Sequence, residues 1–221
     1  MNQRTYITAL LAFSFVLTLF TPIIAQQPKS EAEIRKLLAK SRSKDLKVSD
    51  EANEQLSKLD SSSVPALVVI LKKGNSCERV RAAGYINEFD PKNPNVIPAM
   101  TKLISESSLK VLFNLQEEMM CRRAAGQVLA LSADGIKELK QLLKDGDDWE
   151  RETAIFALDD LTETANYPEG SLPVMTELIP EIGRATKAKN EVLSGMADEV
   201  LGQIARGPNT ELSELAKKYI K

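Results

Sequence analysis

The sequence contains no histidine and only two cysteines among its 221 residues. Histidine is the usual general base near neutral pH, and it completes the Ser–His and Cys–His pairs of nucleophilic catalysis, so those arrangements are excluded. Two cysteines without histidine cannot make a zinc site of the standard kind. They are also too few for a fold built on a disulfide framework. We therefore expect no enzyme activity, no cofactor and no metal ion.

The chain also lacks an excess of charge of either sign. It has 29 lysines and arginines against 31 aspartates and glutamates, a net charge of −2. A nucleic acid or an anionic membrane would call for a basic excess. We therefore expect no nucleic acid partner.

The first 25 residues have the layout of a secretory signal peptide. Arg4 precedes an uncharged stretch from Tyr6 to Ala25, Pro22 interrupts its helix, and Ala25 offers a small residue before a polar segment. The alternative is an uncleaved membrane anchor, since about 20 apolar residues span a bilayer. We expect an exported protein, periplasmic or extracellular, with residues 26–221 as a single repeat domain. Membrane contact is expected only if residues 1–25 stay attached.

One short helical pattern returns five times along the rest of the chain. Arg81–Ile86 (RAAGYI) is repeated as Arg123–Leu129 (RAAGQVL) and more loosely as Glu152–Leu158 (ETAIFAL), and fainter copies centre on Ala52 and Ala197. A small residue with apolar residues three, four and seven positions on marks the buried stripe of an amphipathic helix. Its return at intervals of 31, 42, 29 and 43 residues predicts stacked helical hairpins.

Each copy is the second helix of a pair, and an apolar-periodic first helix precedes it. The pairs are expected at about 30–60, 63–89, 95–132, 135–162 and 171–205, with a closing helix at 210–220. No stretch sustains the period of two that a strand requires. We therefore expect an all-α, right-handed α-solenoid of about five hairpins, with the second helices lining its concave side.

The turns between paired helices carry capping signals. Asn75–Glu78 and Asp147–Glu150 each read as a capping box, with an acid at the third helical position. Gly74 and Gly146 stand where the preceding helices end, and we expect them to adopt left-handed caps.

The Arg-x-Ala-Ala-x-x-Leu-like cores resemble HEAT repeats, in particular the HEAT-like variant first noted in phycobilisome lyases. The resemblance covers about residues 30–220 and is strongest at Arg79–Phe89, Arg122–Leu131 and Trp149–Leu161. Asp50 and Glu152 depart from the family's usual arginine. The resemblance implies a HEAT/armadillo-like superhelix, and it implies little about activity, because such repeats occur in scaffolds, adaptors and a few enzymes.

Arginines beside the repeat cores are the first candidates for partner contacts. Arg81 and Arg123 share one register, and they form either a basic strip that grips an acidic partner or a structural ladder between repeats. In HEAT-like proteins such an arginine bonds the capping acid of a neighbouring unit. Arg79 and Arg122 have no fixed structural role of this kind, so we expect them on the contact surface.

The fourth hairpin carries mostly negative charge. Eight acids lie between Asp145 and Glu163 against Arg151 alone. Some of these cap helices or favour a helix N-terminus, and the rest form either a solvated face or a contact for a basic partner. We take Glu150, Asp159 and Asp160 as candidates. A surface that is positive on the second and third hairpins and negative on the fourth suits a protein or peptide ligand.

Two apolar features interrupt the pattern. Residues 109–115 (LKVLFNL) stand where a plain hairpin needs only a few polar residues, so this insert either packs on the core or presents Leu112 and Phe113 to a partner. Trp149 begins a second helix, as a buried wedge between hairpins or as an exposed interface anchor.

Cys77 and Cys121 lie near the starts of neighbouring second helices, and export permits a disulfide between them. Cys121 stands four residues before Ala125 on the buried stripe, whereas Cys77 stands six before Ala83, about 100° from it. This mismatch argues against good disulfide geometry. The alternative is two buried thiols.

Together these features predict a non-enzymatic scaffold or adaptor that binds a protein or peptide outside the cytoplasm. One alternative, which the resemblance implies, is a lyase-like enzyme or a cofactor chaperone subunit. Another is a structural envelope protein tethered by Tyr6–Ala25.

Overall fold

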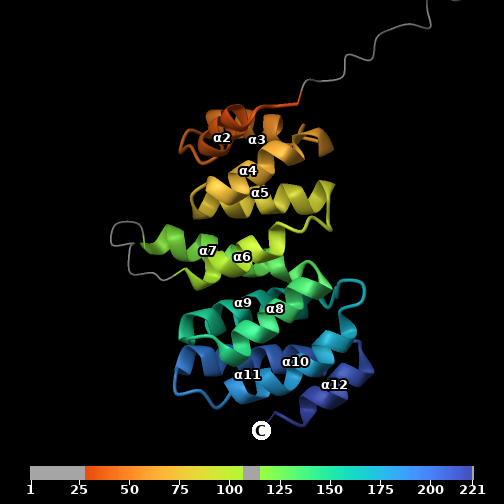
Figure 1. Ribbon diagram of the computed structural model, residues 1–221. Coiled ribbons are helices and arrows are strands. Elements are labelled where there is room, and N and C mark those ends of the chain that lie inside the picture. The colour runs from red at the N-terminus through yellow and green to blue at the C-terminus, as the bar shows by residue number, and fades with distance from the viewer. Residues whose placement is uncertain (1–27, 107–114, 221) are drawn as a thin grey trace, which may run out of the picture.

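The computed structural model describes residues 28–106 and 115–220, and these residues form an elongated stack of helices (Figure 1). The predicted signal peptide and the candidates Leu112 and Phe113 lie outside the described residues. The elements are α2 (Glu31–Lys40), α3 (Leu46–Leu56), η1 (Ser61–Ser63), α4 (Val64–Lys73), α5 (Ser76–Phe89), α6 (Val96–Ser105), α7 (Leu115–Ala130), α8 (Ala133–Asp145), α9 (Asp148–Thr164), α10 (Leu172–Ala185), α11 (Glu191–Arg206) and α12 (Thr210–Lys217).

Consecutive α-helices pair, and the pairs stack in chain order. The second helices α5, α7, α9 and α11 each pack on the next, and α12 covers the last pair by contacting both α10 and α11. The prediction of an all-α solenoid is confirmed. At the other end it is α2 that packs on the second pair, through α4 and α5, while α3 packs mainly on α2.

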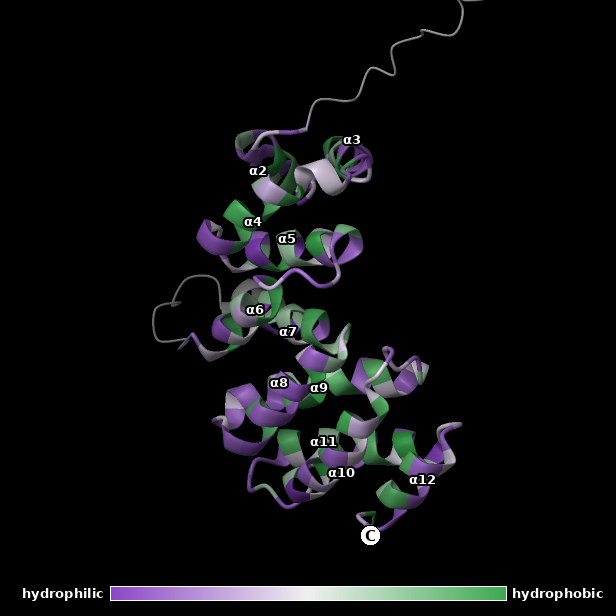
Figure 2. Ribbon diagram, turned by 45° about the vertical axis from the view of Figure 1, so that its right-hand side comes forward, coloured by the Kyte–Doolittle hydropathy of each residue, from purple (hydrophilic) through white to green (hydrophobic). Residues whose placement is uncertain are grey.

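The repeated alanines form the spine of the core. Ala52, Ala83, Ala125, Ala154 and Ala197 are all at most 2% exposed. Leucine and isoleucine side chains from both helices of each pair surround this spine, and the hydrophobic positions face the interior of the stack (Figure 2). A small residue at each of these positions lets neighbouring helices approach closely.

The capping boxes are confirmed. The Asn75 side chain accepts a hydrogen bond from the Glu78 N–H at 3.0 Å, and Asp147 and Glu150 make the same reciprocal pair. A third box, Ser30 with Glu33, begins α2.

The expected left-handed caps at Gly74 and Gly146 are wrong. Both glycines have extended backbones, with φ of −71° and −72°. Glycine is favoured at both positions because a Cβ atom would approach a backbone carbonyl too closely. A Cβ at Gly74 would lie 2.7 Å from the carbonyl O of Ile70, and a Cβ at Gly146 would lie 2.4 Å from the carbonyl O of Leu142.

Within the described part of the chain, no helix has both the length and the apolar character needed to cross a bilayer.

Candidate partner-binding groove

An open groove of about 370 Å³ lies on the described surface where α7 and α9 end. The loop from α9 to α10 forms its third side, and in Figure 1 this loop projects from the edge of the stack. We call this hollow the α7–α9 groove. Its lining residues are Gln127, Ala130, Leu131, Ala157, Asp160, Leu161, Thr164, Asn166 and Pro168.

The loop turns back beside the groove because α9 ends in a left-handed residue. Ala165 has φ of +50°, and its N–H donates to the carbonyl O of Thr162 at 3.3 Å. Tyr167 packs against the core from within the loop, and its burial raises the pKa of its hydroxyl. Anchored in this way, the loop brings Asn166 and Pro168 to the groove.

Most of the lining is apolar. Leu161 is nearly buried, whereas Leu131, immediately after α7, has 61% of its surface exposed. Alanines at 130 and 157 leave room between them, because a larger residue at either position would fill the hollow. The groove therefore combines a concave shape with one exposed apolar side chain.

The polar groups of the groove are acidic or neutral. Gln127 of α7 donates a hydrogen bond from its side-chain amide to the carboxylate of Asp160 on α9, which is itself exposed. No lysine or arginine is among the lining residues. Glu163 and Glu169, next to the lining residues Thr164 and Pro168, are both exposed.

The helix ends add to this negative character. Both α7 and α9 end at the groove, and neither carries a basic residue in its last turn. By contrast, the first helices α8 and α10 carry Lys144 and Arg184 there. The carbonyl end of a helix has a partial negative charge, which a nearby cation stabilises. Helices α3 and α5 also end without a basic residue. At the α7–α9 groove two such helix ends meet, and no basic side chain in their last turns offsets their negative partial charge.

Of the three acidic candidates, the structure places Asp160 alone in the groove. The Asp159 carboxylate accepts a hydrogen bond from the Gln203 side chain of α11 at 2.8 Å, so it joins two helices. Glu150 closes the capping box of α9, where its carboxylate accepts from the N–H of Asp147 at 2.8 Å. Both of these acids have structural partners.

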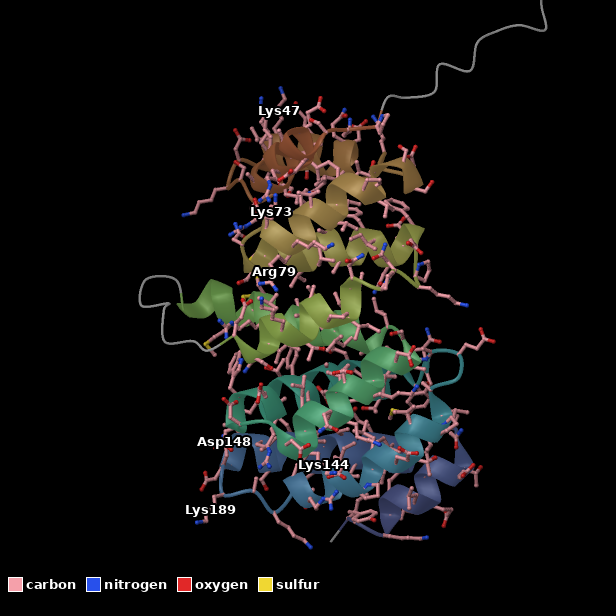
Figure 3. All side chains as sticks on the ribbon, in the orientation of Figure 1. Lys47, Lys73, Arg79, Lys144, Asp148 and Lys189 are labelled. Atoms are coloured by element: carbon pink, nitrogen blue, oxygen red, sulfur yellow. A yellow bond between two sulfur atoms is a disulfide. The ribbon has the colours of Figure 1, made fainter. Side chains whose placement is uncertain are left out.

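Arg79 and Arg122, which we expected on the contact surface, have partners within the stack. The Arg79 guanidinium bonds the carboxylate of Glu106 at 2.9 Å and the carbonyl O of Ala99 at 3.1 Å. Arg122 is only 4% exposed and donates to the carbonyl O of Glu106. Both arginines contact Glu106, the residue that follows α6, where the negative end of the helix favours cationic donors. Figure 3 labels Arg79 at this edge of the stack.

Arg81 and Arg123 make contacts between repeats. Arg81 donates to the carbonyl O of Leu38 at 3.3 Å and to the hydroxyl of Ser41, both at the end of α2. Arg123 lies over the ring of Phe156 on α9, with 5.1 Å between its guanidinium carbon and the ring centre. The expected bond to a capping acid is made instead by Arg35, which contacts Glu78 at 2.6 Å.

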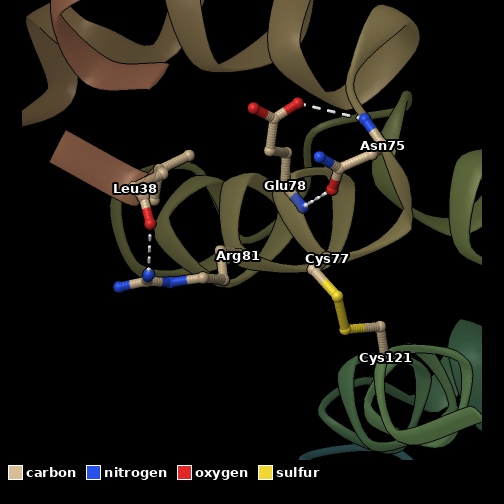
Figure 4. Close-up of a disulfide and its surroundings, with 6 residues drawn as sticks. All are labelled: Leu38, Asn75, Cys77, Glu78, Arg81 and Cys121. Atoms are coloured by element: carbon tan, nitrogen blue, oxygen red, sulfur yellow. Dashed lines mark hydrogen bonds between the residues drawn. A yellow bond between two sulfur atoms is a disulfide. The ribbon is translucent and has the colours of Figure 1, made fainter. Parts of the chain in front are cut away.

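Cys77 and Cys121 are joined by a disulfide, with 5.0 Å between their Cα atoms (Figure 4). The argument from mismatched register was wrong for a geometric reason. Two stacked helices touch through opposite faces, so equivalent register positions point the same way rather than toward each other. The offset between the two cysteines lets Cys77 on α5 face Cys121 on α7.

Sequence reasoning missed most of the groove. The repeat pattern did not show that the loop between α9 and α10 folds back beside the end of α7. Trp149 is half-buried, and its indole N–H is enclosed without a hydrogen-bond acceptor. It lies at the other end of α9 from the groove, as the bounds of that helix show.

Across residues 28–106 and 115–220, no three potential ligand side chains are grouped in a way that could hold a metal ion.

No protein-family model and no curated protein matches the chain. Among solved structures, an engineered protein is similar over 85% of this chain and 95% of its own, with 15% identity and a TM-score of 0.42. Two designed armadillo repeat proteins, one of them in complex with the peptide (KR)4, are each 17% identical over 85% of this chain and 98% of their own. Their TM-scores are 0.33 and 0.32. At this level of similarity nothing about function follows.

Proposed function

We propose that the chain is a non-enzymatic scaffold that binds a protein or peptide outside the cytoplasm, and that the α7–α9 groove is its contact site. The observation that carries the proposal is the exposed Leu131 beside the accessible Asp160 in one hollow. An apolar side chain of a partner would lie against Leu131 and the two alanines, where it would lose its contact with water.

The partner segment is expected to carry a basic side chain next to its apolar one. Asp160 keeps acceptor capacity after its bond from Gln127, since a carboxylate can accept about four hydrogen bonds. The two helix ends without basic residues favour a cation at the same place. A lysine or arginine of the partner would bond the Asp160 carboxylate and would also be favoured by the two helix ends.

Two observations support an oxidising compartment. The chain carries a secretory-type N-terminal sequence, and its two cysteines lie close enough to be bridged. Disulfides persist in exported proteins and are rare in the cytosol.

The test is selection of random nonapeptides, displayed on phage, against the protein and against Leu131→Asp. Peptides that pair a basic with an apolar residue should be enriched by the protein, and Leu131→Asp should weaken their binding at least about tenfold, because it places a carboxylate on the apolar wall. Leu46→Asp is the matched control, since Leu46 is 77% exposed on α3, away from the groove.

Equal selection by the protein and by Leu131→Asp would refute the groove as the contact site. Selection of peptides without basic residues would leave the scaffold role standing and refute the proposed chemistry of the partner.

A further inference from the structure

A second hollow, of about 240 Å³, lies at the other end of α9. It is bounded by the turn from α8 to α9 and by the end of α10, and Figure 3 labels Lys144 and Asp148 on either side of that turn. Its lining residues are Leu143, Lys144, Arg151, Glu181, Arg184, Ala185, Lys187 and Ala188. We call this hollow the basic pocket.

Charge is what distinguishes the basic pocket. Four of its lining residues are cationic and one is anionic, a balance of 4 − 1 = +3. The single acid, Glu181, forms an ion pair with Arg184. Lys144, Arg151 and Lys187 have no carboxylate partner among the lining residues.

Helix-end electrostatics explain only two of these cations. Lys144 and Arg184 occupy the last turns of α8 and α10, where a cation is favourable. Arg151 is the fourth residue of α9, where the helix end is positive and a cation is unfavourable. Lys187 stands after the end of α10. The helix dipoles therefore do not account for Arg151 and Lys187.

The guanidinium of Arg151 makes few hydrogen bonds within the protein. One terminal nitrogen donates to the carbonyl O of Lys144 at 3.3 Å, and the enclosed Nε finds no acceptor among the described residues. An arginine offers five donors in a planar fork that suits an oxyanion. The Nε is enclosed, so the terminal nitrogens of the fork are the donors that Arg151 can offer to a ligand in the hollow, and one bond to Lys144 is formed by one of them.

We infer that the basic pocket binds a small phosphate-class oxyanion, with Arg151 as the forked donor and Lys144 and Lys187 as point charges. Its volume lies just below the ~300–1,000 Å³ of sites for drug-sized ligands, which suits inorganic phosphate or a small phosphate ester. The ligand's negative charge would be attracted by the three cations that have no carboxylate partner among the lining residues. This site is separate from the α7–α9 groove, because the two hollows share no lining residue. Arg151 precedes Ala157, the first residue of α9 that lines the groove, by six residues, about 9 Å at 1.5 Å per residue.

The experiment titrates the ¹⁵N-labelled protein with inorganic phosphate at constant pH and ionic strength, with chloride as the reference salt. The side-chain N–H signal of Arg151 and the backbone amides of 184–188 should shift along a saturable curve with phosphate and stay unchanged with chloride. A parallel titration with glycerol 3-phosphate against glycerol distinguishes the two sources, because an ester-binding pocket would bind the ester more tightly than phosphate and ignore glycerol.

The double variant Lys144→Ser, Lys187→Ser should weaken phosphate binding about tenfold or more, since it removes two charges from the wall. Both side chains are exposed, so the fold should tolerate the change. The control Lys217→Ser, Lys218→Ser removes the same charge from exposed positions at the end of α12 and should change binding less than about twofold. Shifts that chloride reproduces, shifts that do not saturate, or equal losses in the two double variants would each overturn the inference.

Discussion

The side-chain amide of Gln127 on α7 donates a hydrogen bond to the carboxylate of Asp160 on α9. The bond joins two second helices inside the groove where both of them end. It fixes the orientation of a carboxylate that is otherwise exposed and leaves part of it open to a partner. We therefore expect the Asp160 carboxylate to contact the partner directly.

Asp160→Asn should weaken the binding of a selected basic peptide about five- to tenfold, because it removes the negative charge while keeping the shape of the side chain. The free energy of unfolding should change by less than about 1 kcal/mol, since the side chain is exposed. Fluorescence anisotropy and urea unfolding measure the two quantities. Asp198→Asn, at an exposed position on α11, is the control. If Asp198→Asn weakened binding equally, the loss would come from the overall charge of the protein and not from a specific contact with Asp160.

Reduction of the Cys77–Cys121 disulfide should lower the free energy of unfolding by about 2–4 kcal/mol. The two cysteines are 44 residues apart in the sequence, and without the bridge the unfolded chain between them gains conformational entropy. Urea unfolding with and without dithiothreitol measures this difference. The double variant Cys77→Ala, Cys121→Ala should unfold as the reduced protein does and show no response to the reductant. A response in that variant would assign the effect to something other than the bridge.

Ala154→Leu should destabilise the fold by about 1–3 kcal/mol. Ala154 is fully buried in α9, so a larger side chain forces the neighbouring helices apart. Ala39→Leu, at an exposed position of α2, should change stability by less than about 0.5 kcal/mol. Thermal unfolding compares the two. Similar losses would show that the alanine register does not mark the close contacts between helices.

Arg122→Ala should cost about 1–3 kcal/mol of stability, because it leaves the carbonyl O of Glu106 without its charged donor and opens a buried space. Peptide binding in the α7–α9 groove should be unchanged. Chemical unfolding and anisotropy test the two statements together. Weakened binding without a loss of stability would return Arg122 to the contact surface, where sequence reasoning had placed it.

Alkaline pH should destabilise the chain partly through Tyr167. Burial raises the pKa of its hydroxyl above the ordinary value near 10, so the folded state holds the proton more tightly than the unfolded state. The stabilisation is complete below pH 10 and is lost as pH rises from there through the folded-state pKa. Urea unfolding at pH 9 and pH 11 should show a smaller decrease for Tyr167→Phe than for the unaltered protein. Equal decreases would mean that the hydroxyl ionises alike in both states.

Features that depend on local sequence were predictable. The buried alanines and the capping boxes follow from residues within one helix or one turn, so Ala83 and Ala125 or Asn75 and Glu78 identify them directly. The groove was only partly predictable. Asp160 was among the candidates, but Leu131 became a site residue only because the loop after α9 folds back toward α7.

The partners of Arg79 and Arg122 were unpredictable for a related reason. Arg79 and Arg122 have no partner within their own helix pattern, and their acceptors on α6 are at the end of a different helix. A pattern that repeats along one helix cannot show which backbone carbonyls the fold will bring beside it.

The bridge between α5 and α7 also changes what a break in the backbone would do. Every peptide bond from residue 77 to residue 121 lies inside one covalent ring closed by the two sulfur atoms. A protease that cut within this ring would yield a nicked protein whose two pieces remain a single molecule. The pieces would separate only under conditions that both unfold and reduce them, so the protein would keep its full mass after such damage.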